Sequence, residues 1–599
     1  MTSYFVASVG TEQAAQTLRQ AVGAHAAWLD MASDFHRESC RNHLVFALGR
    51  LYQGAELAAV DGEDDSIWRF GTPSCYPLDT YLRPAADGSG TVNAARTQVE
   101  VSKADGGILA ATPLCTPERL YWARLDDGWI VGNDIRLLIR ITGREVDPAG
   151  MCAMLRHGAG IFSITVDRRI QCLRPGHVCR LSPDGAAPTV EPIFTFEPPP
   201  GGDPSQADDI VRRCLDEQVA AIPTGSVLGF SGGVDSALIA ARALEMGRRD
   251  LVLVNCAFGD DDAEAVHAAR VADALGLECT VIPFDPAGAA DALDRIATEF
   301  MYPFDDTATL ATNLIAQEAI KIVGAGSTVV DGTGADCAFG EVGYYNKWNP
   351  VYAVPAFLRR LSGRLAGTLR SYRHRWKDSS LHKTLSVMRR AAVLSQCDLV
   401  AIYNNGLEGI VYDVPDEIDE RLRTEIREVR ETLFAGLDPI SVSALLTLVH
   451  FCGGACASKI HHSLRRKGVR AMYPYMAPRV LEVAFGLTWE QKSTGGEPKD
   501  VLKRILAETL PRELIYRTKS GLDTPLHDLW TAPEVPALLE DVLLGPSNEL
   551  LEFVRRDVLE DIAGRMIQGR PVSFEATRTF WNLTMASLWD HQLRQATES

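Results

Sequence analysis

The stretch from Val227 to Ser236, VLGFSGGVDS, joins a short apolar strand to the start of a helix through two glycines. Gly232 and Gly233 let backbone N–H groups approach an anion closely, and a helix N-terminus adds partial positive charge. Asp235 would repel a bare anion, but it can hold a magnesium ion that bridges to a phosphate. The stretch therefore predicts a phosphate-binding turn, with an ordinary strand-to-helix turn as the alternative. It is not a Walker loop, because no Gly-Lys-Ser or Gly-Lys-Thr follows.

The sequence around this turn alternates between strand and helix patterns. We expect strands at 226–230, 251–258, 278–284 and 327–331, and helices at 208–221, 236–246, 263–275 and 309–323. Strands that alternate with helices are typical of parallel βαβ units, so the predicted fold class is α/β with a doubly wound parallel sheet. Beyond about residue 385 the apolar spacing favours a mostly helical segment.

Residues 194–205, FTFEPPPGGDPS, interrupt the chain with prolines and glycines that can continue neither a helix nor a central strand. They predict a linker between a first domain, residues 1–200, and a second domain, residues 206–599. In the first domain short apolar runs alternate with turn signals, and Asp126-Asp127-Gly128 predicts a hairpin. We expect this domain to be rich in β-strands, with a few helices such as 11–30.

The composition excludes several classes of protein. The 599 residues include 78 acidic and 60 basic side chains, which gives a net charge of −18, and 46% of the residues are apolar. An apolar share of this size excludes a disordered or fibrous chain. The acidic balance argues against binding nucleic acid through its phosphates. The basic stretch 359–383 is either a solvated face or a docking site for an acidic partner.

The sequence predicts neither export nor a membrane span. Its N-terminus lacks the basic and apolar regions of a signal peptide. The longest charge-free stretch, 439–458, contains Ser, Thr, His and Gly residues, which favour a buried helix. The 13 cysteines show no zinc-site spacing and fit small buried side chains in a reducing compartment. We therefore expect a cytoplasmic protein.

Four segments, in this order along the chain, resemble the asparagine synthetases of the ATP pyrophosphatase superfamily. Residues 231–236, SGGVDS, resemble the superfamily's PP-loop, and residues 329–340, VVDGTGADCAFG, resemble the family's SGEGSDExFGG loop. Residues 473–484 and 498–521 resemble two later segments of the family. The resemblance implies a PP-loop sheet, ATP and Mg²⁺ as cofactors, and transfer of AMP to a carboxylate with release of pyrophosphate.

The resemblance also implies roles for particular residues. Those that would contact the nucleotide are Phe230, Ser231, Gly232, Gly233, Asp235, Ser236, Ala257, Asp331 and Gly332. Asp235 and Asp336 match the two carboxylates that hold magnesium, a hard cation that takes carboxylate and phosphate oxygens together. Lys519 matches the lysine that stabilises charge on the phosphates and on the developing intermediate. Lys499 is a second catalytic candidate, and a structural role is the alternative for it and for Arg517.

The first domain resembles a class II glutaminase, an Ntn-type αββα fold, in residues 121–134 and 173–181. Asparagine synthetases of this type begin with a cysteine nucleophile. Here the second residue is Thr2 and the first cysteine is Cys40. This implies a glutaminase-like domain that has lost its chemistry, and a substrate that carries its own amine. Thr333 replaces a family glutamate, so the general base is unassigned.

These departures favour a lasso peptide cyclase of the asparagine synthetase-like family. Such an enzyme adenylates an Asp or Glu side chain of a precursor peptide, and the peptide's N-terminal amine then closes a macrolactam. The basic and aromatic insert at 343–438 could grip the peptide, and the family implies a leader peptidase and a leader-recognition protein as partners. The alternatives are a β-lactam or other small-molecule lactam synthetase, a glutamine-independent amide ligase, and an inactive relative that only binds a partner.

Overall fold

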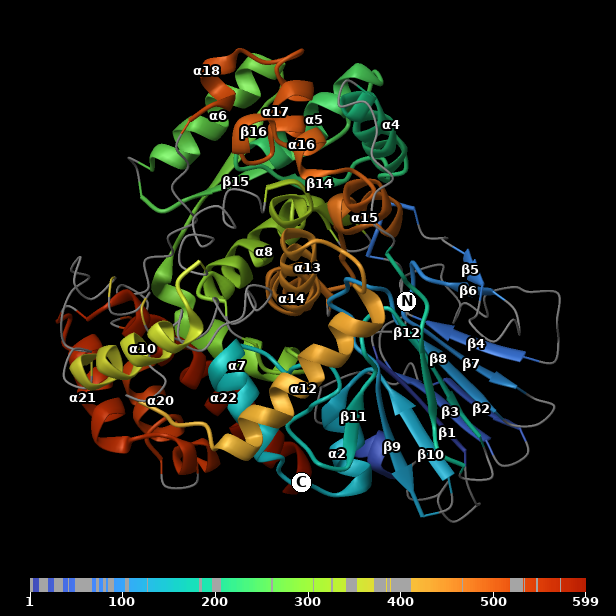
Figure 1. Cartoon of the computed structure of the whole chain (residues 1–599), viewed down its shortest axis with the longest axis vertical. Helices are drawn as coiled ribbons and strands as arrows, with labels where there is room; N and C mark the ends of the chain where they lie inside the picture. Colours follow the sequence, from blue (N-terminus) through green and yellow to red (C-terminus); the bar gives the residue numbers. More distant parts are fainter. Residues whose placement is uncertain are drawn as a thin grey trace.

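Two large antiparallel sheets, a two-stranded antiparallel pair, one parallel sheet and many helices make up the described part of the computed structural model (Figure 1). The structure describes residues 91–102, 107–182, 186–196, 206–259, 262–340, 353–370, 411–517 and 530–598, except positions 127, 305, 325, 326, 466, 531, 533, 546, 547 and 571. It also describes residues 4–9, 20–25, 36–40, 43–48, 67–71, 75–78, 82–84, 384 and 388. Lys519, Thr2 and the linker residues 197–205 lie outside the described residues.

The first part of the chain contains the two antiparallel sheets. The six-stranded sheet has the order β11-β9-β10-β1-β3-β2, and the five-stranded sheet has the order β13-β12-β8-β7-β4. The strands, with a small separate pair β5–β6, are β1 (Tyr4–Val9), β2 (His36–Cys40), β3 (His43–Leu48), β4 (Ile67–Gly71), β5 (Leu82–Pro84), β6 (Thr91–Asn93), β7 (Gln98–Ser102), β8 (Ile108–Ala111), β9 (Tyr121–Leu125), β10 (Gly128–Gly132), β11 (Ile170–Cys172), β12 (His177–Leu181) and β13 (Thr189–Pro192). The predicted richness in β-strands is confirmed, while the likeness to a glutaminase stays a prediction.

Apolar side chains pack these two sheets face to face. Val99 and Val101 are buried on one face of β7, as the two-residue period of a strand requires. They share a core cluster with Trp129 of β10 in the other sheet. β9 and β10 form the predicted hairpin, in which Leu125 lies opposite Gly128.

The second part of the chain contains the parallel sheet, in the order β16-β15-β14-β17-β18. Its strands are β14 (Val227–Gly229), β15 (Val252–Ala257), β16 (Cys279–Pro283), β17 (Thr328–Val330) and β18 (Arg470–Met472). The first four were predicted, so the α/β class with a parallel sheet is confirmed. The sequence did not reveal β18, because three residues are too short for a periodic signal and its partner β17 lies far away along the chain.

Helices pack around this sheet and form most of the C-terminal part, as predicted (Figure 1). Two of them, α6 and α8, have the predicted bounds. The helices are α2 (Ile135–Thr142), α3 (Pro148–His157), α4 (Ala207–Ala220), α5 (Val234–Glu245), α6 (Ala263–Leu275), α7 (Ala289–Glu299), α8 (Thr309–Val323), α10 (Ala356–Arg370), α12 (Asp416–Leu433), α13 (Pro439–Thr447), α14 (Ala457–Arg465), α15 (Pro478–Phe485), α16 (Trp489–Lys492), α17 (Asp500–Leu506), α18 (Arg512–Ile515), α20 (Val535–Val542), α21 (Arg556–Ile567) and α22 (Phe574–Glu598).

Within the part of the chain that the structure describes, one helical stretch, Pro439–Arg465, is long and apolar enough to cross a membrane. It consists of α13, a π-helical segment at Leu448–Cys456, and α14. Of its most apolar window, 83% is buried inside the protein. Burial of this extent is typical of a core helix, which is what the sequence of 439–458 predicted.

Helix α12 attaches the first part of the chain to the second. Arg174 donates from Nε and Nη2 to the carboxylate of Glu425, at 2.9 and 2.7 Å, and the Ser163 N–H donates to the same carboxylate at 2.9 Å. Burial alone would raise the pKa of Glu425, but Arg174 and Ser163 lower it below its ordinary value. Phe196, in the first part of the predicted linker, also packs on Phe434 at the end of α12. The two parts therefore share a polar contact that is mostly shielded from water.

Replacing Glu425 with glutamine should destabilise the protein by about 3 kcal/mol, because one member of a buried ion pair loses its charge. Glu428 contacts the same arginine but its side chain is 48% exposed, so Glu428→Gln is a matched control. The control should cost less than about 1 kcal/mol. Chemical denaturation measures both free energies of unfolding, and equal losses would contradict the assignment.

The lowered pKa of Glu425 also predicts a pH dependence. A depressed carboxyl pKa contributes stability that is present above the ordinary pKa of glutamate, about 4.3, and is lost as the pH falls through the lower pKa of the folded state. The difference in stability between the natural chain and Glu425→Gln should therefore shrink below about pH 4.3.

Candidate functional site

The candidate site lies where two loops leave neighbouring strands at the centre of the parallel sheet. β14 pairs with β17, while the strands that follow β14 in sequence, β15 and β16, lie on its other side. Parallel sheets bind ligands at such a switch point, beyond the carboxyl ends of the strands. The glycine turn at 231–236 follows β14, and residues 331–340 follow β17. The predicted phosphate and magnesium segments therefore lie side by side.

The glycine turn packs closely against the start of α6. Gly232 has a φ of +67°, and a Cβ atom added to it would lie 2.8 Å from the Cα atom of Ala268. The N-cap residue of α5 is Gly233. Because glycine has no side chain, it cannot cap the first N–H groups of the helix with a side-chain hydrogen bond. The Oγ atoms of Ser231 and Ser236 lie 3.5 Å apart beside the turn. This arrangement of an uncapped helix N-terminus and two hydroxyls can bind a phosphate.

The two predicted magnesium ligands share one lysine. Lys499 Nζ lies 2.7 Å from Oδ2 of Asp235 and 2.7 Å from Oδ1 of Asp336. Burial alone would lower the pKa of Lys499, but the two carboxylates raise it above its ordinary value. The structure thus brings together three of the predicted site residues, and the space between the two carboxylates is occupied by a positive charge.

Two carboxylates that attract a cation fit a magnesium site, provided that phosphate oxygens and water complete the coordination. Among the described residues no group of three or more His, Cys, Asp and Glu side chains could hold a metal ion by itself. Asp235 and Asp336 are therefore residues that would hold magnesium together with a nucleotide, rather than a closed metal cage.

Tyr475 contacts the segments that carry Asp235 and Asp336, and the sequence did not reveal this role. Its hydroxyl donates to the backbone carbonyl of Asp235 at 3.0 Å, and its ring packs edge-on against Phe339 in the turn that begins at Asp336. The side chain is completely buried. Gly332 is close as well, because a Cβ atom there would lie 2.9 Å from Cβ of Asp235. The available signal was that a buried tyrosine hydroxyl needs a partner.

Asp331 shapes the loop after β17. Its backbone N–H donates to the carbonyl of Met472, and its Oδ1 accepts hydrogen bonds from the N–H (2.8 Å) and the hydroxyl of Thr333. Thr333 is therefore directed at Asp331.

Phe230 and Ala257 end the neighbouring strands β14 and β15, where their backbone groups extend the sheet. Their contact with a nucleotide through backbone groups stays a prediction.

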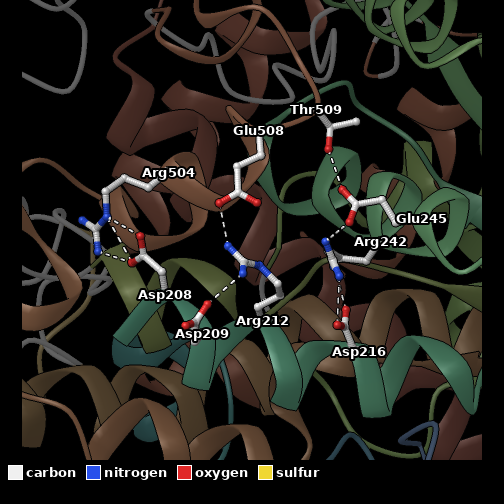
Figure 2. Close-up of polar contacts among 9 residues, drawn as sticks. All are labelled: Asp208, Asp209, Arg212, Asp216, Arg242, Glu245, Arg504, Glu508 and Thr509. Atoms are coloured by element: carbon white, nitrogen blue, oxygen red, sulfur yellow. Dashed lines mark hydrogen bonds and ion pairs between the residues drawn. The ribbon is translucent and has the colours of Figure 1, made fainter. Parts of the chain in front are cut away.

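Ion pairs between α4, α5 and α17 hold the two helices whose N-termini form the site. Figure 2 shows this seam: from α4, Asp208 contacts Arg504 (2.5 Å), Arg212 contacts Glu508 (2.6 Å) and Asp216 contacts Arg242 (2.6 Å). Asp235 lies in the first turn of α5, and Lys499 is the N-cap of α17. The seam therefore sets the position of one side chain relative to the other.

Arg517 does not join Asp235 and Lys499. It forms an ion pair with Glu264 in the first turn of α6, with Nη1 to Oε1 at 3.0 Å, a contact that fits the structural alternative. Lys519 lies outside the described residues, so its catalytic role stays a prediction.

Removing the Tyr475 hydroxyl should affect the site more than it affects the fold. Tyr475→Phe is expected to cost about 1 kcal/mol of stability, the usual net value of one hydrogen bond. Tyr473→Phe is the matched control, because its hydroxyl donates to the Ala457 carbonyl (2.6 Å), not to Asp235. Thermal unfolding should show similar losses for both variants, whereas ATP–pyrophosphate exchange should fall only in Tyr475→Phe. Equal exchange rates would show that Tyr475 does not position Asp235.

A glycine turn at a helix N-terminus, beside two carboxylates at the switch point of a parallel sheet, is an arrangement in which α/β proteins bind phosphate-containing ligands. The sequence profile described as asparagine synthase matches residues 206–591. The chain therefore belongs to the asparagine synthase family, whose members are ATP-dependent amide ligases.

Individual relatives are distant. A Mycobacterium bovis protein with the provisional name asparagine synthetase (glutamine-hydrolyzing) is 24% identical over 455 residues, 71% of this chain. Asparagine synthetase (glutamine-hydrolyzing) 1 of Bacillus subtilis is 22% identical over 492 residues, 78% of this chain and 73% of that protein. The match spans 64% of the length of the mycobacterial relative.

Among solved structures, an NH3-dependent NAD synthetase from Campylobacter jejuni aligns with 42% of this chain and 94% of its own. The sequence identity is 16% and the TM-score is 0.18.

Proposed function

We propose that the protein activates a carboxylate with ATP and joins it to an amine as an amide. The carboxylate oxygen would attack the α-phosphorus of ATP, which forms an acyl-adenylate and releases pyrophosphate. The amine would then attack the acyl carbon and release AMP. The observation that carries this proposal is the position of Asp235, Asp336 and Lys499 beside the glycine turn.

The chain's own groups have distinct tasks in this reaction. The N–H groups at the start of α5 bind the phosphates, and Ser231 and Ser236 add hydroxyl donors. Asp235 and Asp336 would hold magnesium, which when bound neutralises charge on the phosphates. Lys499, which pairs with Asp235 at the glycine turn, would stabilise the negative charge that develops on the departing pyrophosphate.

We further propose that acid and amine belong to one peptide, so that the enzyme is a lasso peptide cyclase. A pre-folded peptide makes ring closure an intramolecular reaction, which favours an oriented attack. The insert supports this proposal, because Phe357, Leu361 and Leu365 of α10 are 68%, 64% and 59% exposed. Among the described residues, this helix and Val354 before it carry five of the eleven exposed large apolar side chains.

α10 also has the charge expected of a peptide-binding surface. Its sequence, AFLRRLSGRLAGTLR, contains four arginines and no acidic residue in a chain of net charge −18. An apolar stripe with flanking cations suits a peptide that is partly apolar and carries the Asp or Glu to be activated. The precursor peptide, a leader peptidase, a leader-recognition protein and a cytoplasmic location are parts of the same proposal.

The decisive experiment is ATP–pyrophosphate exchange with candidate acids, followed by mass spectrometry of the product. A cyclase should respond to a precursor core peptide, lose the response when the acceptor Asp or Glu is made amide, and yield a peptide lighter by one water. Exchange with free aspartate or another small acid alone would instead favour a small-molecule amide ligase or lactam synthetase.

Two variants test whether α10 contacts the peptide. Leu361→Ser should raise the KM for the peptide without changing the KM for ATP. Ile322→Ser is the matched control, because Ile322 is also a helical apolar side chain with 47% exposure. An unchanged KM for the peptide in Leu361→Ser would exclude α10 as the binding surface.

A further inference from the structure

Lys499 occupies the position in which a divalent cation would bind Asp235 and Asp336. Its Nζ atom is 2.7 Å from one oxygen of each carboxylate. Magnesium bound to the same oxygens would lie at about 2.1 Å from them. An ammonium group and a divalent cation at such similar positions would repel each other strongly, because they would lie within a few ångström of each other.

The backbone of Lys499 is fixed, although its side chain has four rotatable bonds. Its φ of +58° is in the left-handed region, which residues other than glycine rarely adopt. Its N–H donates to the carbonyl of Phe339 at 3.1 Å, within the turn that begins at Asp336. A Cβ atom on Gly340 would lie 3.1 Å from Cγ of Lys499, so the stem of the side chain is also closely packed. Strained residues held in this way are common at functional sites.

The charges at the site favour an exchange of cations. With Lys499 in place, two carboxylates face one positive charge, and a free divalent ion would have to displace that charge into the protein. A metal that arrives with the ATP triphosphate brings its own anion. The ammonium can then move from the carboxylates to a phosphate oxygen without losing an ionic partner.

We propose that Lys499 excludes free divalent metal from Asp235 and Asp336 and admits the metal only together with ATP. This inference rests on the proposed function, because it takes these two carboxylates as the magnesium ligands. Lys499 thereby has a second task besides stabilising pyrophosphate, because its charge sets the order in which metal and nucleotide bind.

The test is binding of Mn²⁺, followed by electron paramagnetic resonance, without nucleotide. The natural chain should bind free Mn²⁺ at least about tenfold more weakly than Lys499→Met, which keeps most of the length of the side chain and removes its charge. Adding a non-hydrolysable ATP analogue should remove most of this difference. Lys503→Met is the matched control, because Lys503 lies one turn further along α17 and pairs with Glu497.

Two more variants keep the test interpretable. Lys499→Asn tolerates the left-handed backbone better than methionine does, so it replaces Lys499→Met if that variant unfolds. Asp235→Asn combined with Lys499→Met should abolish the tight Mn²⁺ binding, which places the ion at the proposed carboxylates.

The results separate this inference from the proposed function. If the natural chain binds free Mn²⁺ as tightly as Lys499→Met, the inference is wrong, whether or not exchange activity is found. If Lys499→Met gains the site but no acid supports exchange in the natural chain, the inference stands and the function fails. If neither the natural chain nor any variant binds Mn²⁺, even with the ATP analogue, then Asp235 and Asp336 are not metal ligands and the inference is wrong.

Discussion

Replacing Asp235 with asparagine should lower ATP–pyrophosphate exchange by about 10²- to 10³-fold. It should also cost some stability, because the buried Lys499 keeps only Asp336 as an ionic partner. The substitution keeps the shape of the side chain and the hydrogen bond from Tyr475, which involves the backbone carbonyl. It removes one of the two negative charges that would hold magnesium against the phosphates. Steady-state exchange at saturating ATP, measured beside thermal unfolding, gives both quantities.

The control for this substitution is Asp209→Asn. Asp209 lies in the first turn of α4, its side chain is 66% exposed, and it pairs with Arg212 outside the site. Exchange should be unchanged in this variant. A fully active Asp235→Asn enzyme would disprove the metal-binding role, and with it the main support for the proposed chemistry.

Replacing Gly232 with alanine should have the second large effect, a loss of ATP binding of about 10²-fold or more, because the loop that carries the phosphate-binding N–H groups must move. Two costs add at this position. The φ of +67° is unfavourable for alanine, and the new methyl group would lie 2.8 Å from the Cα atom of Ala268. Backbone atoms cannot move aside as the end of a flexible side chain can.

Gly247→Ala separates these two costs. Gly247 lies just beyond the other end of α5, its φ is +76°, and no heavy atom lies within 4 Å of a Cβ atom added there. This control should lose about 1 kcal/mol of stability from the backbone conformation alone and bind ATP normally. Calorimetric ATP titration compares the variants; if both bind ATP equally, the close packing of the turn on α6 is unimportant.

Local signals explain which elements could be predicted from the sequence. The bounds of α6 were correct because Asp262 caps its first N–H groups and Gly276 ends it with a positive φ. The turn after β14 was recognisable for the same reason, since glycines and a helix start lie within a few residues. Such features depend on neighbours in sequence, which a single chain displays directly.

Features that depend on distant pairing were not predictable in this way. Lys499 is separated from Asp235 by 264 residues, and nothing in the spacing could show that their side chains meet. Tyr475 lies in the segment 473–484 that resembles the family, but its hydroxyl contacts a backbone carbonyl of Asp235, which no sequence pattern displays. The sequence supplied the candidates, and packing of α17 and the 473–476 segment on the sheet determined which of them act together.

The contacts of α12 and of the core helix affect how this protein could be dissected. The family match begins at residue 206, which invites expression of residues 206–599 alone. Such a fragment would leave Glu425 without Arg174 and Ser163, and the Leu448 carbonyl without the thiol of Cys115 that lies 3.1 Å away. Unpaired groups of this kind favour aggregation or rearrangement over a native-like fold. The segment recognised by homology is thus smaller than the piece of chain that can be cut out and still fold.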